Sequence, residues 1–501
     1  MAPVHRTRSE RSSRARGPRG RRLFAGLVLV LALFGCGRKS PSGGKGPAHP
    51  HHPAGLFATL PSVALVGEPV TLRVAPLDSI GAPASSWSGR LDVSSADSAV
   101  VASGPFSGGD TGSFSCPIFF RTPGIHRVTV RSDAGDSAVA GPVRVVTTDE
   151  ELRARPGEAA RRLLWGDAHG HSNVGDGANP PDHYLYYGRD VAHLDYLCLS
   201  EHDFQQFLSV GLDVEAGSWQ QIATLAKQWR RPGFAVLLGW EWSSREQGHR
   251  VILFPSDSTQ YVSYRDVATP AALADALRGS GAVSVLAHPT GSELTPPINW
   301  DTVVPGFDRA IEIYSGHGGM DDTDFRPSTK PHDGHSALDA LRRGLDLAFV
   351  AFSDTHLSTP GNPWPPPIRD APFRGGLTAI WCSGGTEKDV LDGLAAGRCY
   401  ATSGERFYVE FRANDRSLGE TLVVAPTDRV RVHAFVAAAR EVAWVELLAS
   451  DRVLSRRNGG GADLTIDVDL GPFAEPTALW MRGASADGER FWTTPVRIVS
   501  P

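Results

Sequence analysis

Cysteine is scarce in this chain, with five among 501 residues. Cys116, Cys198, Cys382 and Cys399 show no C-x-x-C spacing, so a metal site built on cysteine is not expected. They could form one disulfide in an oxidising compartment, although spacing alone does not pair them. Cys198 lies inside an apolar stretch and is expected to be a small buried side chain.

Two familiar catalytic signatures are also missing. No G-x-S-x-G nucleophile motif stands beside the polar strand ends described below, so an activated serine is not indicated. The glycine pair Gly384-Gly385 and the run Gly459–Gly461 lack the strand-to-helix context of a dinucleotide-binding loop. The sequence therefore predicts no nucleotide-binding fold.

The apolar run near the N-terminus, LFAGLVLVLALF, has only twelve residues, whereas a membrane-spanning helix needs roughly 18. Eight arginines precede it, and a basic flank before a short apolar run is typical of a secretory signal. The run ends in Leu33-Phe34-Gly35-Cys36, which resembles a bacterial lipobox. That resemblance implies cleavage after residue 35 and a lipid on Cys36; an uncleaved anchor helix is the alternative.

Charge excludes one class of partner. The formal net charge is −5, and removing residues 1–35 takes away eight arginines and Glu10, so the mature charge becomes −5 − 7 = −12. An acidic protein of this kind is not expected to bind nucleic acid nonspecifically. We expect a bacterial cell-envelope lipoprotein that faces the periplasm or the exterior and contacts the membrane through the lipid on Cys36.

The rest of the chain divides into four parts. Residues 36–54 are rich in Pro, Gly and Ser and read as a flexible tether, in which His49, His51 and His52 are expected to be solvated. Residues 55–148 show short alternating strands, which predict an Ig-like β-sandwich. Residues 160–404 alternate apolar strands with helices, and residues 405–501 return to period two, which predicts a C-terminal β-sandwich.

The central part carries eight apolar runs that we interpret as strands. They are LLWGDAH, LDYLCLSEH, FAVLLGWEW, HRVILF, VSVLAHP, AIEIYS, LAFVAFSDTH and LTAIWCS. Helical stretches such as PAALADALRG lie between several of them, and TEKDVLDGLAAG opens with a T-x-x-D start signal. This alternation predicts parallel βαβ units in an α/β fold, and its length suits a closed β/α barrel better than an open sheet.

Histidines and carboxylates gather at the ends of these strands. In a strand, residues i and i+2 point to one face about 6.6 Å apart, so H-x-H and D-x-H each offer two ligands to one site. Imidazole nitrogens and carboxylate oxygens suit a borderline divalent ion. The candidate metal ligands are His169, His171, Asp176, His202, Glu241, His249, His288, Asp354 and His356.

Nine such groups are too many for one ion, and three ions with one shared carboxylate would use them all. Two ions about 3.5–4 Å apart could share a hydroxide for attack on phosphorus. Each histidine taken singly is more often an ordinary core or surface residue. Glu241 needs a partner in either case, because an unpaired buried carboxylate is costly; a metal ion is one solution and Arg245 is another.

The order of these motifs resembles the PHP (polymerase and histidinol phosphatase) superfamily, whose fold is a distorted (β/α)7 barrel. WGDAHGHS, GWEWSSREQGHRVILF, FSDTHLSTPGNP and the stretch from GGLTAIWCS to RFYVEF are similar to its carbaryl-hydrolase-like branch and to DUF3604 proteins. The resemblance covers residues 160–415 or so, and the N-terminal sandwich lies outside it. It implies a distorted (β/α)7 barrel flanked by the two sandwiches.

The resemblance also implies a ligand assignment. His169, His171, Glu241 and Asp354 would hold the first ion; Glu241, as a bridge, with His249 and His288 would hold the second; Asp176, His202 and His356 would hold the third. Two positions depart from the family pattern. Asp176 stands where some members have histidine, and Glu201 stands where aspartate often precedes the histidine, so we expect Glu201 to orient an imidazole.

Six other positions carry weaker expectations. His317, His332 and His335 lie in a polar loop that could cover the site, although a solvated surface loop is favoured. Strand alternation turns Arg250 to the face opposite His249. Arg245 and Arg326 are candidates for binding a substrate anion.

These features predict a metal-dependent hydrolase, with zinc, manganese or iron as cofactor and a small ester as substrate. A metal-bridging hydroxide would attack a phosphate mono- or diester. The same site could cleave a carbamate or carboxylic ester. A third interpretation is a non-catalytic metal-binding envelope lipoprotein, and a fourth, the amidohydrolase superfamily, would want a bridging lysine where Glu241 stands.

Overall fold

The structure is a computed structural model that describes residues 55–84, 87–97, 101–107, 113–203, 216–255, 260–292, 295–328, 330–367 and 371–501. The predicted signal peptide, the predicted lipid site on Cys36 and the predicted tether with its three histidines lie outside these residues. In the part of the chain that is described, no helix has the length and apolar character needed to cross a membrane. Its four cysteines are free.

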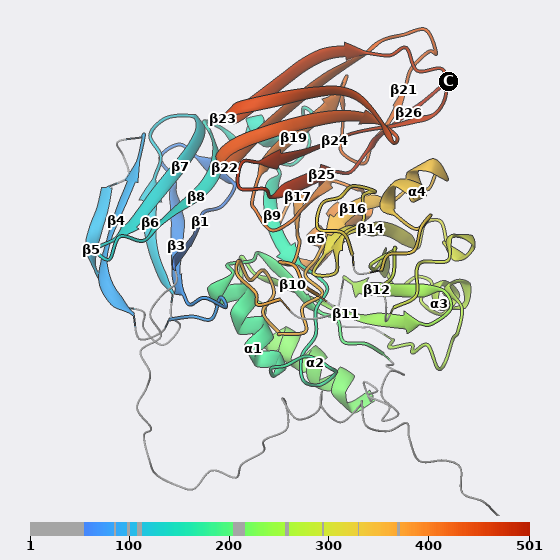
Figure 1. The fold of residues 1–501 in the computed structure, drawn as a ribbon, viewed down its shortest axis with the longest axis horizontal. Coiled ribbons are helices and arrows are strands. Elements are labelled where there is room, and N and C mark those ends of the chain that lie inside the picture. Colours follow the sequence, from blue (N-terminus) through green and yellow to red (C-terminus); the bar gives the residue numbers. More distant parts are fainter. Residues whose placement is uncertain are drawn as a thin grey trace, which may run out of the picture. The chain divides into compact units, whose positions relative to one another are not determined.

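Residues 55–146 form two sheets around one apolar core (Figure 1). A three-stranded sheet has the order β1-β3-β6, from β1 (Gly55–Thr59), β3 (Pro69–Leu77) and β6 (Phe114–Phe119). A five-stranded sheet has the order β2-β8-β7-β4-β5, from β2 (Val63–Leu65), β4 (Ser88–Ser95), β5 (Val101–Ser107), β7 (Gly124–Ser132) and β8 (Ser137–Val146). Alternation places Leu72, Val74, Val128 and Val130 in the core, because successive side chains point to opposite faces.

All eight apolar runs of the central part are strands. They are β9 (Arg162–Asp167), β10 (Tyr196–Leu199), β11 (Ala235–Ser244), β12 (Gly248–Phe254), β13 (Val283–Leu286), β14 (Asp308–Ser315), β16 (Ala348–Ala351) and β17 (Leu377–Cys382). The pairs β9–β10, β10–β11, β13–β14 and β14–β16 are parallel. Such strands are buried on both faces, which explains their near-continuous apolar character.

The expectation of parallel pairing throughout is wrong at β12 and at β17. β17 runs antiparallel to β9, and β12 runs antiparallel to β11 and to β13. Only residues 245–247 connect β11 to β12, whereas a parallel neighbour needs a crossover of a dozen residues or more. The hairpin brings His249 of β12 beside Ser243 of β11, close to Glu241.

Among the described residues, helices are fewer than a sevenfold strand–helix repeat requires, so the (β/α)7 expectation is not confirmed. The described α-helices are α1 (Pro181–Tyr186), α2 (Ala216–Trp229), α3 (Pro270–Ala276), α4 (Ala337–Arg342) and α5 (Glu387–Ala395). The start signal predicted for α5 is confirmed as a capping box between Thr386 and Asp389. Strand is the commonest element of the described chain, and short helices accompany the mixed sheet.

The sheet of the central part continues into the C-terminal strands. β17 pairs with β9 and with β18 (Cys399–Thr402), and β18 pairs with β25 (Arg490–Thr493). The further strands are β19 (Tyr408–Ala413), β20 (Arg416–Ser417), β21 (Thr421–Val423), β22 (Val430–Ala449), β23 (Arg452–Leu470), β24 (Thr477–Ser485) and β26 (Val496–Val499). The alternation of Val430, Val432, Ala434 and Val436 places all four in the core.

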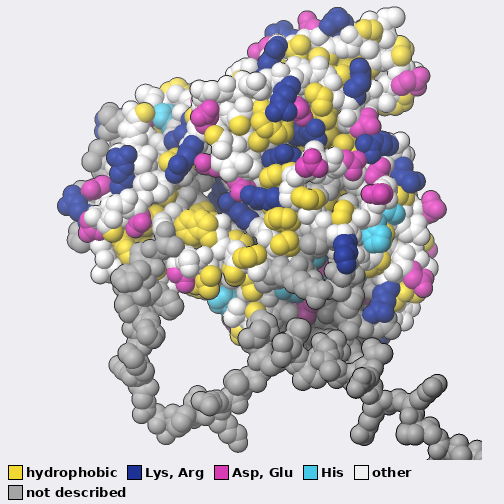
Figure 2. Space-filling model, viewed as in Figure 1, with side chains coloured by type: hydrophobic (Ala, Val, Ile, Leu, Met, Phe, Trp, Pro, Cys, Tyr) yellow, Lys and Arg dark blue, Asp and Glu magenta, His cyan; other side chains and the backbone are white. Residues whose placement is uncertain are grey.

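On the face drawn in Figure 2, basic and acidic side chains are interspersed over the N-terminal sheets and over the C-terminal strands. Domain boundaries at residues 148, 160 and 404 stay predictions.

Candidate metal centre

The nine predicted ligands converge because six strand segments deliver them to one place. His169 and His171 follow β9, His202 follows β10, Glu241 and His249 lie on β11 and β12, His288 follows β13, and Asp354 and His356 follow β16; Asp176 lies in the loop after His171. Isolated parallel bridges join Gly170 to Thr355 and His202 to Glu241. The structure therefore brings all nine together, and their ligation of metal stays a prediction.

Two of these positions have unusual backbone. His288 has φ +28° and Asp354 has φ +50°, a region that residues with a Cβ rarely adopt. Hydrogen bonds hold both: the amide of His288 donates to Glu312 Oε2 at 2.7 Å, and the amide of Asp354 donates to the carbonyl of His169 at 2.8 Å. Strain of this kind persists where surrounding contacts enforce it, and it gathers at functional sites.

Glu241 is the centre of the cluster. The side chain is fully buried, and five imidazoles surround it. Its Oε1 lies 2.7 Å from His249 Nδ1 and 3.0 Å from His288 Nε2. Its Oε2 lies 2.9 Å from His202 Nδ1, 3.2 Å from His169 Nε2 and 3.5 Å from His171 Nε2. A carboxylate with histidines around both oxygens is placed to serve more than one ion.

Asp354 forms a second point of convergence. Its Oδ1 lies 3.0 Å from His171 Nε2 and 3.4 Å from His169 Nε2. Its Oδ2 lies 2.7 Å from His317 Nε2. His317 is buried, so the expectation of a solvated loop is wrong at this position. The same loop does leave His332 exposed, while His335 Nδ1 contacts the carbonyl of Ile298 at 2.7 Å.

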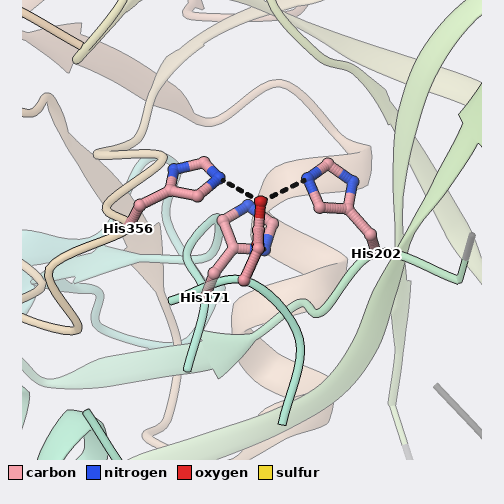
Figure 3. A group of neighbouring side chains, drawn as sticks. His171, His202 and His356 are labelled. Carbon is pink, nitrogen blue, oxygen red and sulfur yellow. Dashed lines mark ion pairs between the residues drawn. The ribbon is translucent and has the colours of Figure 1, made fainter. Parts of the chain in front are cut away.

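A third group lies nearer the surface. In Figure 3, His356 and His202 point toward one another, with His171 between them. The carboxylate of Asp176 joins them, since its Oδ2 lies 3.1 Å from His356 Nε2 and 3.9 Å from His202 Nε2. The ligand atoms of these four residues lie within 4.8 Å of one another. This group matches the third predicted set, with His171 added.

Buried polar atoms without hydrogen-bond partners test whether these residues suit a metal. Among the described residues, buried atoms that make no hydrogen bond include His169 Nε2, His171 Nδ1, His288 Nδ1, His317 Nδ1 and Glu241 Oε2. Native interiors rarely leave such atoms unsatisfied. Imidazole nitrogens and carboxylate oxygens are the ligands that zinc, manganese and iron share, so the cluster fits divalent cations.

The charges of the cluster are strongly coupled. Burial opposes ionisation of Glu241, but positive charge on His202 and His169 holds its pKa well below the usual range. Burial also opposes protonation of His202, yet the negative charges of Glu241 and Asp176 raise its pKa to about 9. Burial and the neighbouring His356 and His202 lower the pKa of His171 to about 4. A divalent ion would take the place of these protons, because histidine binds a metal in its neutral form.

Glu312 is a functional residue that the sequence interpretation missed. It is fully buried on β14, and its Oε1 accepts from His169 Nδ1 at 2.7 Å. That contact fixes the imidazole so that its Nε2 faces Glu241, which is how outer carboxylates orient metal-binding histidines. The available signal was a glutamate inside the apolar run AIEIYS. Glu241 occupies a similar position in LLGWEWS and is a predicted ligand for that reason.

Glu201 contacts the loop that carries Asp176 rather than a ring nitrogen at close range. Its Oε1 accepts from the Ser172 amide at 2.8 Å and from the Ser172 hydroxyl. Its Oε2 lies 3.9 Å from His171 Nδ1. Burial raises the pKa of Glu201 to about 7. Glu201 therefore anchors the backbone after His171, while its role in orienting an imidazole stays a prediction.

The arginines behave differently from one another. Arg250 turns away from the cluster, as alternation predicts, and is fully buried with its Nε 3.2 Å from Asp308 Oδ1. Arg326 donates to Glu489 Oε1 at 2.8 Å and to the Tyr314 hydroxyl at 2.9 Å. Its guanidinium is thus already engaged by the protein.

Comparisons with known proteins add little to this geometry. No family model matches the chain. Uncharacterized proteins of Chlamydia trachomatis and Chlamydia muridarum are 24% identical over 415 residues and 23% identical over 409 residues, in each case across 76% of this chain. The chain spans 63% of the length of these relatives.

Two solved structures show the level of structural likeness. A two-domain protein of Bacteroides vulgatus containing a predicted PHP-like metal-dependent phosphoesterase is 16% identical, with coverage of 67% of this chain and 96% of that chain and a TM-score of 0.37. A β-glucuronidase of Bacteroides uniformis reaches a TM-score of 0.16. Such low TM-scores do not establish a shared fold, so the chemistry is inferred from this chain's own residues.

Proposed function

We propose that this protein is a metal-dependent hydrolase that cleaves phosphate mono- or diesters. The observation that carries the proposal is the position of Glu241: a fully buried carboxylate whose two oxygens face five histidines. A structural metal site closes with four ligands, whereas this cluster offers several overlapping sets around shared carboxylates. An assembly of that kind is typical of sites that hold adjacent ions for hydrolysis.

The chain's own groups would divide the work. His169, His171, Glu241 and Asp354 would hold one ion, His249 and His288 with Glu241 a second, and Asp176, His202 and His356 a third. Divalent ions, when bound, would supply Lewis acidity: they would lower the pKa of water and neutralise negative charge on the ester oxygens. Glu312 orients His169, and Ser172 with Glu201 fixes the loop that carries Asp176.

Phosphate esters are the first choice of substrate because the ester oxygens are anionic and the cluster would gather cationic charge. The motif resemblance to the PHP superfamily supports the same choice. Carbamate and carboxylic esters remain the alternative substrates, because water activated by bound ions would attack them as well. A non-catalytic metal-binding lipoprotein is the alternative from another functional class.

One experiment separates these proposals. Purified protein is stripped of metal, reloaded with Mn²⁺ or Zn²⁺ and assayed with p-nitrophenyl phosphate, bis-p-nitrophenyl phosphate and a naphthyl carbamate. Turnover of a phosphate ester that disappears in Glu241→Ala and persists in Glu246→Ala supports the proposal; Glu246 is an exposed glutamate five residues along the chain. Turnover of the carbamate alone favours the alternative substrates. Stoichiometric metal without any turnover favours the binding protein.

We also propose that Cys36 carries a lipid that anchors the protein in the bacterial envelope. The support is the basic flank, the twelve-residue apolar run and the LFGC sequence. Metabolic labelling with a fatty acid tests it: the wild-type chain should take up label and fractionate with membranes. The Cys36→Ser variant should remain unlabelled, and equal labelling of both would contradict the proposal.

A further inference from the structure

A second cavity lies at the other end of β9 from the metal centre. The empty space between its walls measures about 740 Å³, and part of that space is open to solvent. Its walls come from the segment before β9, from β17 and the start of β18, and from β19, β20 and the residues that follow. We call it the arginine pocket because Arg153, Arg155, Arg161, Arg398 and Arg412 line it.

The floor of the arginine pocket is apolar and aromatic. Leu152, Val409 and Leu418 are buried there. The rings of Trp381 and Tyr408 meet edge to face, with centroids 6.0 Å apart and an interplanar angle of 81°. A floor of this kind suits the body of a small organic molecule, because pockets for such ligands are mostly apolar with a few placed polar groups.

Two of the arginines are already neutralised by the protein. Arg155 Nη2 donates to both oxygens of Glu420, at 2.7 and 2.8 Å. Arg161 Nη2 donates to Glu158 Oε2 at 2.9 Å. The Arg155–Glu420 pair holds the segment before β9 against the C-terminal strands, whereas Arg161 and Glu158 pair within that segment.

Arg153 and Arg398 lack such partners. Among the described residues, neither has a carboxylate oxygen within 4 Å, and the buried Nε of Arg153 makes no hydrogen bond. Within the described residues, the Arg398 side chain makes one hydrogen bond. It is a long one, 3.4 Å from Nε to the Trp381 carbonyl. Burial and then the positive charge of Arg398 lower the pKa of Arg161.

We propose that the arginine pocket binds a small organic anion, with its apolar body on Trp381 and Tyr408 and its acidic group between Arg153 and Arg398. Arginine suits this role because its fixed fork of donors matches carboxylate and phosphate oxygens. An anion would satisfy the orphan donor of Arg153 and relieve the repulsion between Arg398 and Arg161. The proposal does not depend on the hydrolase activity.

The pocket is separate from the metal centre. Trp381 pairs with Leu163 near the start of β9, and His169 follows the end of that strand. The six residue-to-residue steps from Leu163 to His169 span roughly 20 Å at about 3.3 Å each. An anion in the arginine pocket therefore cannot touch the metal ligands, and the two sites can be tested independently.

Calorimetric titration with three probes tests the proposal. Benzenephosphonate carries both an aromatic body and an acidic group, inorganic phosphate has the charge alone, and benzyl alcohol has the body alone. We expect benzenephosphonate to bind at least about tenfold more tightly than either of the others, because only it uses both floor and arginines. Equal affinities, or no binding of benzenephosphonate, would overturn the proposal.

Variants locate the binding. Arg398→Gln and Arg153→Gln should each weaken benzenephosphonate binding at least about tenfold, as expected for loss of a charge-assisted hydrogen bond. Arg452→Gln, an exposed arginine on β23, is the matched control and should bind as the wild type does. Arg398→Lys, which keeps the charge without the fork, should fall between the wild type and Arg398→Gln.

Glu241→Ala separates the two sites. Benzenephosphonate binding should persist in this variant, whose metal centre is disabled. It should weaken at least about tenfold in Arg398→Gln, whose metal content should remain unchanged. The reverse pattern would place the anion at the metal centre and sink the proposal. Melting curves of all variants check folding, and if Arg398→Gln unfolds, Arg153→Gln and Arg398→Lys still decide.

Discussion

Glu241 and Asp308 are two buried carboxylates of the same sheet with opposite surroundings. Asp308 accepts from Arg250 Nε at 3.2 Å, from the Ser284 hydroxyl at 2.6 Å and from the Val304 amide at 2.8 Å. Glu241 has only imidazoles around it, and its Oε2 accepts no hydrogen bond from the described residues. Asp308 is thus satisfied by the protein, whereas Glu241 is arranged for a cation that the protein does not itself supply.

Two neighbouring residues of β12 contact the two carboxylates from opposite faces of the strand. His249 faces Glu241 and Arg250 faces Asp308, because neighbouring side chains of a strand point to opposite faces. Burial alone therefore does not distinguish a structural carboxylate from a functional one. The identity of the partners does, and it leads to different expectations for mutation at the two sites.

The largest effect is expected for Glu241→Ala. The variant should lose more than one metal ion per chain, because the carboxylate would be shared between ions, and activity should fall to that of metal-free protein. Metal content per folded chain, measured by elemental analysis, checks this, with Glu246→Ala as control. Loss of no ion would refute the bridging assignment.

Asp308→Ala should act on stability instead. Removal of one partner leaves Arg250 buried and uncompensated, so the free energy of unfolding should drop by about 3–5 kcal/mol. Metal content per folded chain should stay at the wild-type level. Urea unfolding combined with elemental analysis measures both, and a loss of metal in proportion to the loss of stability would erase the contrast with Glu241.

Glu312→Gln should have a smaller and more selective effect. The amide keeps the shape of the side chain but weakens its hold on His169 Nδ1, so metal affinity should fall about 10- to 100-fold. Competition with a fluorescent chelator gives the affinity. Metal affinity equal to that of the wild type would mean that Glu312 serves the fold in the manner of Asp308.

Asn362→Ala should give the smallest effect. Asn362 lies on the loop after His356, and its Nδ2 donates to the Ile80 carbonyl of the N-terminal sheets at 3.0 Å. Loss of this contact should cost about 0.5–1.5 kcal/mol and should weaken only the ion nearest His356. The number of tightly and weakly bound ions in a metal titration checks this, and equal weakening of all ions would contradict it.

Much of the site could be predicted from sequence because apolar runs fix where strands end. His169, His171, Asp354 and His356 follow such runs at i, i+2 spacing, and the structure places them together. His317 was not recognised because two glycines and several polar residues follow it, as in an exposed loop. Its burial results from tertiary contact with Asp354, which no local pattern reveals.

The antiparallel position of β12 was missed for a different reason. Both β11 and β12 are continuous apolar runs, and period alone does not distinguish a hairpin from a crossover. The three-residue connection over 245–247 was the local signal. The β11–β12 hairpin also explains why no helix lies between these two strands, because antiparallel neighbours need no crossover helix.

The ladder between β18 and β25 has a mechanical consequence. Tyr400–Thr402 pairs with Phe491–Thr493, so strands close to the end of the chain complete the sheet that holds the histidines. Heating should then melt the strands around the metal centre and the last hundred residues in one cooperative step. Deletion of those residues would leave β18 as an edge strand with unpaired backbone N–H and C=O groups. We expect the shortened chain to aggregate rather than to fold as a smaller domain.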